Sequence, residues 1–373
     1  MYHRFSLDKP KPTIKRRSHW KSRRGCLSCK HARVKCDEVH PVCSRCCRQQ
    51  TDCVYQINQI SQTQISTLQS VDIDSAGTPT PHLMQNFAHC IDVSFASPIG
   101  KSIFAQFVLP HSASYPFLIH SLLAFSARHL HHLQPSRSHQ MASLVHAQKA
   151  ARLVNEQLDD VGPHKISHLY AACLVINMTS FADDSPSWIF QSDPAAFTWF
   201  MMQQGLFHLS SILQQHLPHS FWQIKHDALI SSQSSNTLSV SSHLSSHPLF
   251  IDSLSSSLSP QMQDLFETHS DSPYYVPLQL LVHFHRNPST DSLLSFGPRI
   301  PPSFRLRLLQ KDPRALLLFH LWLQLLGRSS CWWIAGRVSR ESAALILQLS
   351  HIPDLRIWKM VRCEIGDCHD VFA

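Results

Sequence analysis

Six cysteines near the start of the chain recur at a spacing that suits metal binding. The pattern is C-x2-C-x6-C-x6-C-x2-C-x6-C, made by Cys26, Cys29, Cys36, Cys43, Cys46 and Cys53. It divides into two near-identical halves, and the three thiols of each half can converge on a tetrahedral zinc ion at about 2.3 Å. Because each ion needs four ligands, six thiolates complete two tetrahedra only if two of them bridge. Cys26 and Cys43 open the two halves and are the natural bridging pair, so the sequence predicts a centre with two Zn²⁺ ions.

Other uses of these thiols are weaker alternatives. The opening residues hold no apolar stretch of a secretory signal, so we expect a reducing compartment rather than disulfides. A ligand at Cys47 in place of Cys46 would break the symmetry of the two halves, so Cys47 is expected to be a free thiol. A zinc fold that serves only protein contacts remains a second alternative.

The positive charge of the chain is confined to its first 55 residues. This segment has 14 Lys and Arg against 4 Asp and Glu, whereas the rest has 19 basic and 21 acidic residues. A polyanion such as double-stranded DNA would meet a cationic head on a nearly neutral body, with strongly salt-dependent affinity. The basic runs at 15–17 and 21–24 suit a nuclear import signal, a phosphate-binding arm, or both; a solvated tail is the alternative.

Residues 25–55, GCLSCKHARVKCDEVHPVCSRCCRQQTDCVY, resemble the fungal Zn2Cys6 binuclear cluster domain of transcription factors. The resemblance implies a zinc-dependent, sequence-specific regulator of RNA polymerase II genes that acts in the nucleus. It also implies that the first short helix of the cluster enters the major groove over a CGG-type triplet.

The basic residues around the first half of the cluster are the candidate DNA contacts. They are Lys30, His31, Arg33 and Lys35, together with Arg23 and Arg24 of the preceding arm. Arg33 is the first candidate for base reading, because its guanidinium fork fits the O6 and N7 atoms of guanine. Ala32 stands where family members commonly carry a cation. A protein that keeps zinc but has lost specific DNA binding is therefore the competing hypothesis.

The rest of the chain predicts a mainly α protein, with a small zinc cluster domain and an all-helical regulatory domain joined by a disordered linker. We expect a basic arm at 1–24, the cluster at 25–55, the linker at 56–82 and the helical domain at 83–373. The linker's apolar spacing is too irregular for a zipper. Residues 231–260 contain 14 serines in 30 positions and are expected to be a disordered insertion.

Within the helical domain, apolar residues recur at helical intervals and local end signals mark several helices. The predicted helices start at Pro116, near Ser138, near Ile166, at Pro194 and at Pro313, followed by two short ones around 331–333 and 339–349. Asp312 suits the N-cap of the helix that begins at Pro313, and Gly327 suits its end. No apolar run reaches the length of a membrane span, so no membrane partner is expected.

This domain also resembles the regulatory domain in relatives of the fungal sterol-uptake regulator, on stretches such as YPFLIHSLLAFSARHL and DPRALLLFHLWLQLL. That resemblance implies a hydrophobic ligand, or contacts with other regulators or the transcription machinery. A lipid or sterol sensor is a further alternative, whose pocket would use Phe125, Met178, Trp199, Trp322 and Trp333. The ordinary interpretation is that these side chains form core. We find no nucleophile elbow, phosphate loop or HExxH motif, and the histidines at 129, 131 and 132 lack a matching ligand, so an enzyme is not expected.

Overall fold

The computed structural model describes residues 25–38, 43–49, 51, 53, 79–159, 161–223, 257–266 and 268–362. The chain divides into two compact units, Met1–Asn58 and Gln59–Ala373. All regular elements of the described residues are helices, which confirms the mainly α prediction. The arm at 1–24, most of the predicted linker and most of the serine-rich segment lie outside the described residues.

The first unit contains two short helices, one in each half of the cysteine pattern. They are α1 (Leu27–His31) and α2 (Ser44–Gln49). Each follows directly after the cysteine that opens its half, so the metal-ligand spacing and the helix starts share the same positions.

The second unit is a set of longer helices joined by short 3-10 and π turns. In its first part they are α4 (Thr80–Ser94), α5 (Pro98–Ile103), η1 (Phe104–Val108), α6 (Leu109–His111), η2 (Ser112–Ser114), α7 (Pro116–Leu133), α8 (Arg137–Asn155), α9 (Pro163–Phe181), η3 (Trp188–Phe190), η4 (Pro194–Phe197), α10 (Thr198–Met201), α11 (Gln203–Gln215) and η5 (Leu217–His219). In its second part they are α13 (Pro260–Leu265), α14 (Tyr275–Arg286), α15 (Thr290–Leu294), α16 (Phe296–Arg299), α17 (Pro302–Leu309), α18 (Pro313–Leu326), α19 (Trp332–Ser350) and α20 (Leu355–Arg362).

Proline begins many of these helices, including α7, α9, α17 and α18. Proline lacks the N–H that would be unpaired in the first turn, and its fixed φ already suits a helix. At α18 the start is reinforced, because the Asp312 carboxylate accepts from the N–H groups of Arg314 and Ala315 at 3.1 and 3.0 Å. These local signals are why the predicted starts at 116 and 313 are confirmed.

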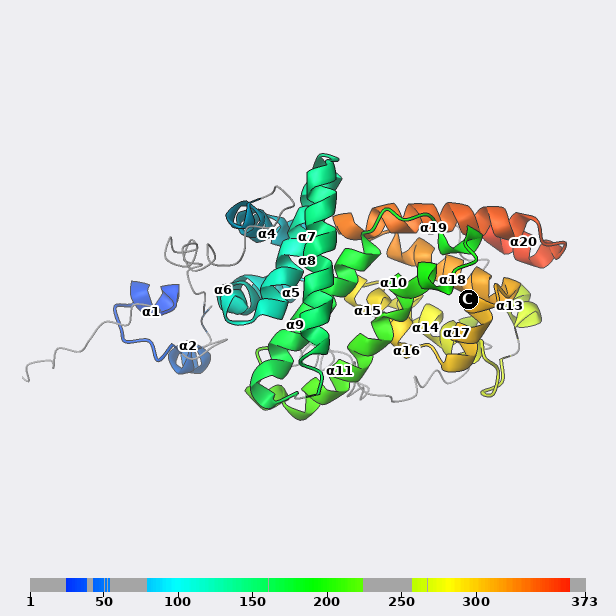
Figure 1. Cartoon of the computed structure of the whole chain (residues 1–373). Coiled ribbons are helices and arrows are strands. Elements are labelled where there is room, and N and C mark those ends of the chain that lie inside the picture. Colours follow the sequence, from blue (N-terminus) through cyan, green and yellow to red (C-terminus); the bar gives the residue numbers. More distant parts are fainter. Residues whose placement is uncertain are drawn as a thin grey trace, which may run out of the picture. The chain divides into compact units, whose positions relative to one another are not determined.

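Two groups of helices build one apolar core in this unit (Figure 1). Helices α7, α8 and α9 pack side by side with α4 and α11, and α18 packs with α14, α15, α17, α19 and α20. Helix α19 also contacts α4 and α9, which joins the two groups. Aromatic rings fill the space between them; the Phe181 ring of α9 and the Trp333 ring of α19, for example, meet edge to face with centroids 5.5 Å apart.

Two of the helix predictions differ from the structure. The two short helices expected around 331–333 and 339–349 are one continuous helix, α19, because the buried residues on both sides of Gly336 offset the modest helix penalty of glycine. The helix expected from Pro194 is broken into η4, α10 and α11, which lets Phe197, Trp199 and Phe200 all reach the core.

Ordered structure also extends beyond two of the predicted boundaries. Helix α4 begins at Thr80, inside the predicted linker. At the end of the serine-rich segment Leu258 is buried and Ser259 caps α13, so order returns before residue 260.

Candidate metal centre and nucleic-acid interface

The six cysteines of the first unit form one cluster. Five of them are at most 2% exposed, and Cys53 packs against them as a partly buried neighbour. The Cys26 sulfur lies 3.9 Å from that of Cys43 and 3.7 Å from that of Cys46, and the Cys29 and Cys43 sulfurs are 3.6 Å apart. The folding of these short segments therefore gathers the thiols that the spacing singled out.

The sulfur separations fit zinc coordination. A tetrahedron with metal–sulfur bonds of about 2.3 Å has sulfur–sulfur edges of about 3.8 Å, and the three separations above fall on either side of that length. One candidate group of ligand atoms combines Cys26, Cys29, Cys43 and Cys46, and the Cys36 sulfur lies within 4.8 Å of that of Cys43. Cys53 interacts with the sulfurs of both Cys26 and Cys43.

Cys26 and Cys43 occupy equivalent and central positions. Each accepts a backbone N–H from the cysteine three residues later, at 3.4 Å from Cys29 to Cys26 and 3.4 Å from Cys46 to Cys43. Both sulfurs thus face the positive N-terminal end of a helix. Burial raises the pKa of Cys26 and the N–H of Cys29 opposes that shift, whereas the pKa of Cys43 is lowered. Further N–H groups, of Glu38 and Cys43, point to the sulfurs of Cys36 and Cys53 at 3.4 and 3.3 Å. Such donors orient metal-bound thiolates and reduce their charge.

Burial raises the pKa of the Cys29 and Cys53 thiols. A metal ion has to displace these protons, so zinc binding and the folding of the cluster are coupled to proton release.

Two side chains that the spacing did not single out tie the halves together. The Asp37 carboxylate accepts from the Ser44 N–H at 3.1 Å, at the start of α2. Arg45 of the second half points Nη1 at the Cys29 sulfur of the first, at 3.9 Å. The pattern Cys-Asp at 36–37 was visible in the sequence, but only the fold shows that this carboxylate reaches the other half.

The predicted DNA contacts of the first half lie together on the exposed end of α1. Lys30, His31, Arg33 and Lys35 are all exposed. The helix stops at His31, so Arg33 lies beyond the helix end and not within it. The N–H of Arg33 donates to the Lys30 carbonyl and that of Val34 to the Cys29 carbonyl, both at 3.1 Å.

This hydrogen-bond pair is a Schellman motif, and Arg33 has the left-handed φ of 53° that the motif requires. Glycine is the usual residue there, because a side chain in this conformation is strained. A charged residue at a position that favours glycine is a candidate for function rather than for stability. Arg23 and Arg24 lie outside the described residues.

The side chains proposed for a lipid pocket are packed into the core of the second unit. Phe125, Met178, Trp199, Trp322 and Trp333 are each at most 4% exposed. Trp199, for instance, makes an edge contact with Phe181 and carries the Arg337 guanidinium over its ring at 5.1 Å. The structure therefore supports the core interpretation of these residues. Within the described residues no helix is both long and apolar enough to span a bilayer.

Comparison with known families agrees with both units. The fungal Zn(2)-Cys(6) binuclear cluster domain matches residues 24–61, and the fungal specific transcription factor domain matches residues 82–279, just over half of the chain. The first match implies two bound zinc ions, and both describe transcription factors rather than enzymes.

Individual relatives show the same division. Sterol uptake control protein 2 of Candida albicans is 56% identical over 43 residues, which are 12% of this chain and 6% of that protein. A Zn(2)-C6 fungal-type transcription factor of Gibberella zeae is 55% identical over 38 residues, 10% of this chain and 8% of that protein. Sterol uptake control protein 2 of Saccharomyces cerevisiae is 23% identical over 273 residues, 65% of this chain and 27% of that protein. The chain thus spans about a quarter or less of the length of these relatives.

Proposed function

This chain belongs to the fungal specific transcription factor domain family, and from that membership we propose that it is a nuclear regulator of RNA polymerase II genes that binds a CGG-type triplet. The observation that carries the proposal is the group of exposed basic side chains at the end of α1, held beside the cysteine cluster. Neither feature alone would suffice, since basic runs and zinc folds also serve other purposes.

In this proposal the six cysteines are the zinc ligands. Cys26 and Cys43 would hold both ions, and the remaining two cysteines of each half would each hold one. The central positions of these two sulfurs and their matching N–H contacts support the assignment. Bound zinc would supply the rigid centre on which α1 is held, because segments this short bury too little apolar surface to fold alone.

Arg33 is the proposed base-reading residue. Its left-handed backbone directs the chain away from the helix axis just beyond α1, and its exposed guanidinium offers the two parallel donors that guanine accepts. Lys30 and Lys35, exposed on either side of it, suit phosphate oxygens, as do Arg23 and Arg24 of the arm. His31 adds a further donor at the same helix end.

Selection from a random DNA library tests this function directly. The zinc-loaded full chain is incubated with the library in parallel with a chelator-treated sample. We expect a CGG motif that is enriched only with zinc, and one copy against two at fixed spacing distinguishes a monomer from a dimer on DNA. An unenriched library with zinc present would refute DNA reading and favour the interaction protein.

Salt dependence gives an independent check on the phosphate-binding side chains. The slope of log affinity against log salt changes by about 0.9 for each DNA phosphate that a basic side chain neutralises. Lys30→Ala and Lys35→Ala should therefore each reduce the slope by about 1 while leaving base preference intact. Lys149→Ala, in α8 of the second unit, is the matched control and should leave the slope unchanged.

A further inference from the structure

The segment that runs from the end of α16 through α17 to the start of α18 is unusually basic. Residues 299–314 contain a single acidic residue, Asp312, against five cations: Arg299, Arg305, Arg307, Lys311 and Arg314. The rest of the chain beyond residue 55 carries 14 basic and 20 acidic residues. This segment is therefore a local positive charge on an otherwise acidic unit, and such a charge attracts an acidic partner.

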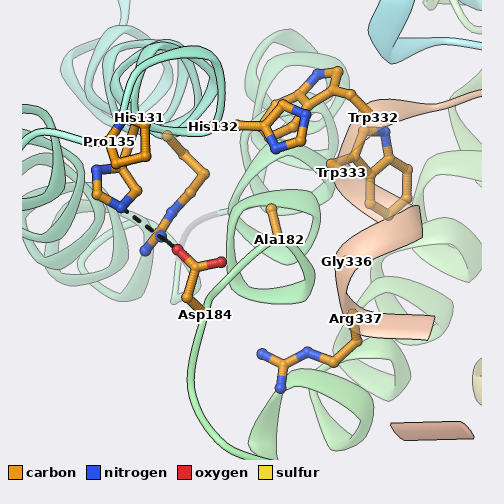
Figure 2. A pocket seen from close by; sticks show the side chains of 10 residues that line it. His131, His132, Pro135, Ala182, Asp184, Trp332, Trp333, Gly336 and Arg337 are labelled. Atoms are coloured by element: carbon orange, nitrogen blue, oxygen red, sulfur yellow. Dashed lines mark hydrogen bonds and ion pairs between the residues drawn. The ribbon is translucent and has the colours of Figure 1, made fainter. Parts of the chain in front are cut away.

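Carboxylates do not neutralise these cations. Within the part of the chain that the structure describes, none of the five forms an ion pair. Asp312 is used elsewhere, since it accepts from the Tyr274 hydroxyl at 2.8 Å and caps α18. By contrast, Arg128 pairs with Asp184 at 2.9 Å, and Figure 2 shows the His131 ring directed at the same carboxylate. The charge around α17 is thus left to solvent or to a partner.

Two exposed leucines lie on the outer face of α17. Leu306 is 55% exposed and Leu309 is 39% exposed. They are three residues apart in the helix, so their side chains are neighbours. Phe304 and Leu308 of the same helix are fully buried and hold its other face on the core. The leucine pair is therefore not needed to fix α17 in place.

Arginines border this pair on both sides. With 3.6 residues per turn, Arg305 and Arg307 lie about 100° to either side of Leu306 around the helix axis. The Arg314 guanidinium of α18 lies over the Tyr274 ring, 5.7 Å from its centroid. Burial raises the pKa of Tyr274, and the positive charges of Arg307 and Arg314 both oppose that rise, which places the two arginines near the same ring. We call the following residues the α17 surface: Arg305, Leu306, Arg307, Leu309 and Arg314.

An apolar strip between cationic edges fits an acidic amphipathic helix. Such a helix could pack its own apolar side chains on Leu306 and Leu309 while the acidic residues beside them face the arginines. A nucleic acid would supply phosphates but would leave the leucines without an apolar partner. Helices that lie in a membrane interface usually present aromatic residues to the lipid, whereas Phe304, the one aromatic residue of α17, is buried.

We propose that the α17 surface binds an acidic amphipathic segment of a partner protein. The arginines would steer and orient the segment, and burial of the leucines would hold it. The surface belongs to the helical unit, so the proposal does not depend on zinc binding or on DNA reading.

Fluorescence anisotropy with the zinc-loaded full chain tests the proposal. The probe is a labelled peptide of sequence EELLEELLEELL. Two matched peptides, EESSEESSEESS and KKLLKKLLKKLL, lack its leucines or its negative charge. We expect the probe to bind at low salt with a Kd below about 100 μM, and each matched peptide to bind at least about tenfold more weakly.

The basic residues at 1–55 could also attract an acidic peptide, so a matched pair of variants locates the binding. Leu306→Ser with Arg307→Glu changes the α17 surface. Leu144→Ser with Arg137→Glu makes the same two changes on α8, where Leu144 is 51% exposed and Arg137 is exposed. Affinity for the probe should fall at least about tenfold in the first variant and stay within about twofold in the second. If the first variant has a lower melting temperature, Leu306→Ser alone replaces it and should weaken binding about fivefold.

Three results would overturn the proposal. They are no binding of the probe by the folded chain, equal affinity of the two double variants for the probe, and a matched peptide that binds as tightly as the probe. The same variants are titrated with a DNA duplex that lacks CGG and with phosphatidylserine vesicles. A surface variant that loses affinity for the duplex or the vesicles, but not for the probe, would assign the surface to a nucleic acid or a membrane instead.

Discussion

Replacing Arg33 separates its contribution to DNA reading from its effect on the stability of the cluster. The residue has φ 53°, a conformation that costs a non-glycine residue about 1–2 kcal/mol. Glycine would remove that strain, but because its unfolded chain is more flexible it would also lower the free energy of unfolding by about 0.5–1 kcal/mol. Arg33→Gly should therefore leave the cluster more stable by up to about 1.5 kcal/mol, whereas Arg33→Ala keeps the strain.

The same replacements should weaken the discrimination between DNA bases. A bidentate arginine–guanine pair contributes about 1–3 kcal/mol of discrimination, which is about 5- to 150-fold in affinity. Arg33→Gly and Arg33→Ala should both lose this discrimination at one base pair. Arg33→Lys keeps the charge but not the fork, so nonspecific affinity should remain while discrimination falls.

Two assays on the full chain measure these quantities. Fluorescence anisotropy compares a CGG duplex with duplexes changed at each base of the triplet, and competition with a chromophoric chelator follows zinc retention. A glycine variant that retains zinc at least as well as the alanine variant, yet reads DNA no better, would satisfy both expectations. Unchanged discrimination in all three variants would refute the assignment of Arg33, and zinc released more readily from Arg33→Gly than from Arg33→Ala would refute the strain argument.

Three further predictions concern the metal and two buried polar groups. Cys26→Ser should lose both zinc ions and Cys53→Ser only one, as counted by plasma mass spectrometry; equal stoichiometry in the two would exclude Cys26 as a bridge. Burial lowers the pKa of His320 from 6.5 to about 4, so between these values the unfolded chain binds a proton that the folded chain does not. The contribution of His320 to the free energy of unfolding should therefore be complete above pH 6.5 and fall by about 3 kcal/mol as the pH drops towards 4. His320→Leu should flatten that part of the pH profile of chemical unfolding, and an unchanged profile would rule out His320 as its source. Glu341→Ala should lower the free energy of unfolding by about 3–5 kcal/mol in the same assay, because it leaves the buried Arg337 without its carboxylate. Changing both residues to Met should cost less, and a double variant less stable than Glu341→Ala would contradict this explanation.

The metal centre could be predicted from sequence because its information is local. The six thiols lie within 28 positions, and coordination chemistry allows few arrangements at that spacing. Proline and aspartate at helix starts act over three or four residues, and for that reason the start of α18 at Pro313 was also predictable. The left-handed backbone of Arg33 was not, because glycine is the residue that normally marks such a position.

The contacts of Arg337 show what sequence cannot supply. Arg337 of α19 donates to the carbonyls of Phe181 and Asp183, which lie more than 150 positions earlier in the chain. No spacing rule connects such positions. The continuous α19 was missed for a related reason, since packing on both sides of Gly336 outweighs its local preference.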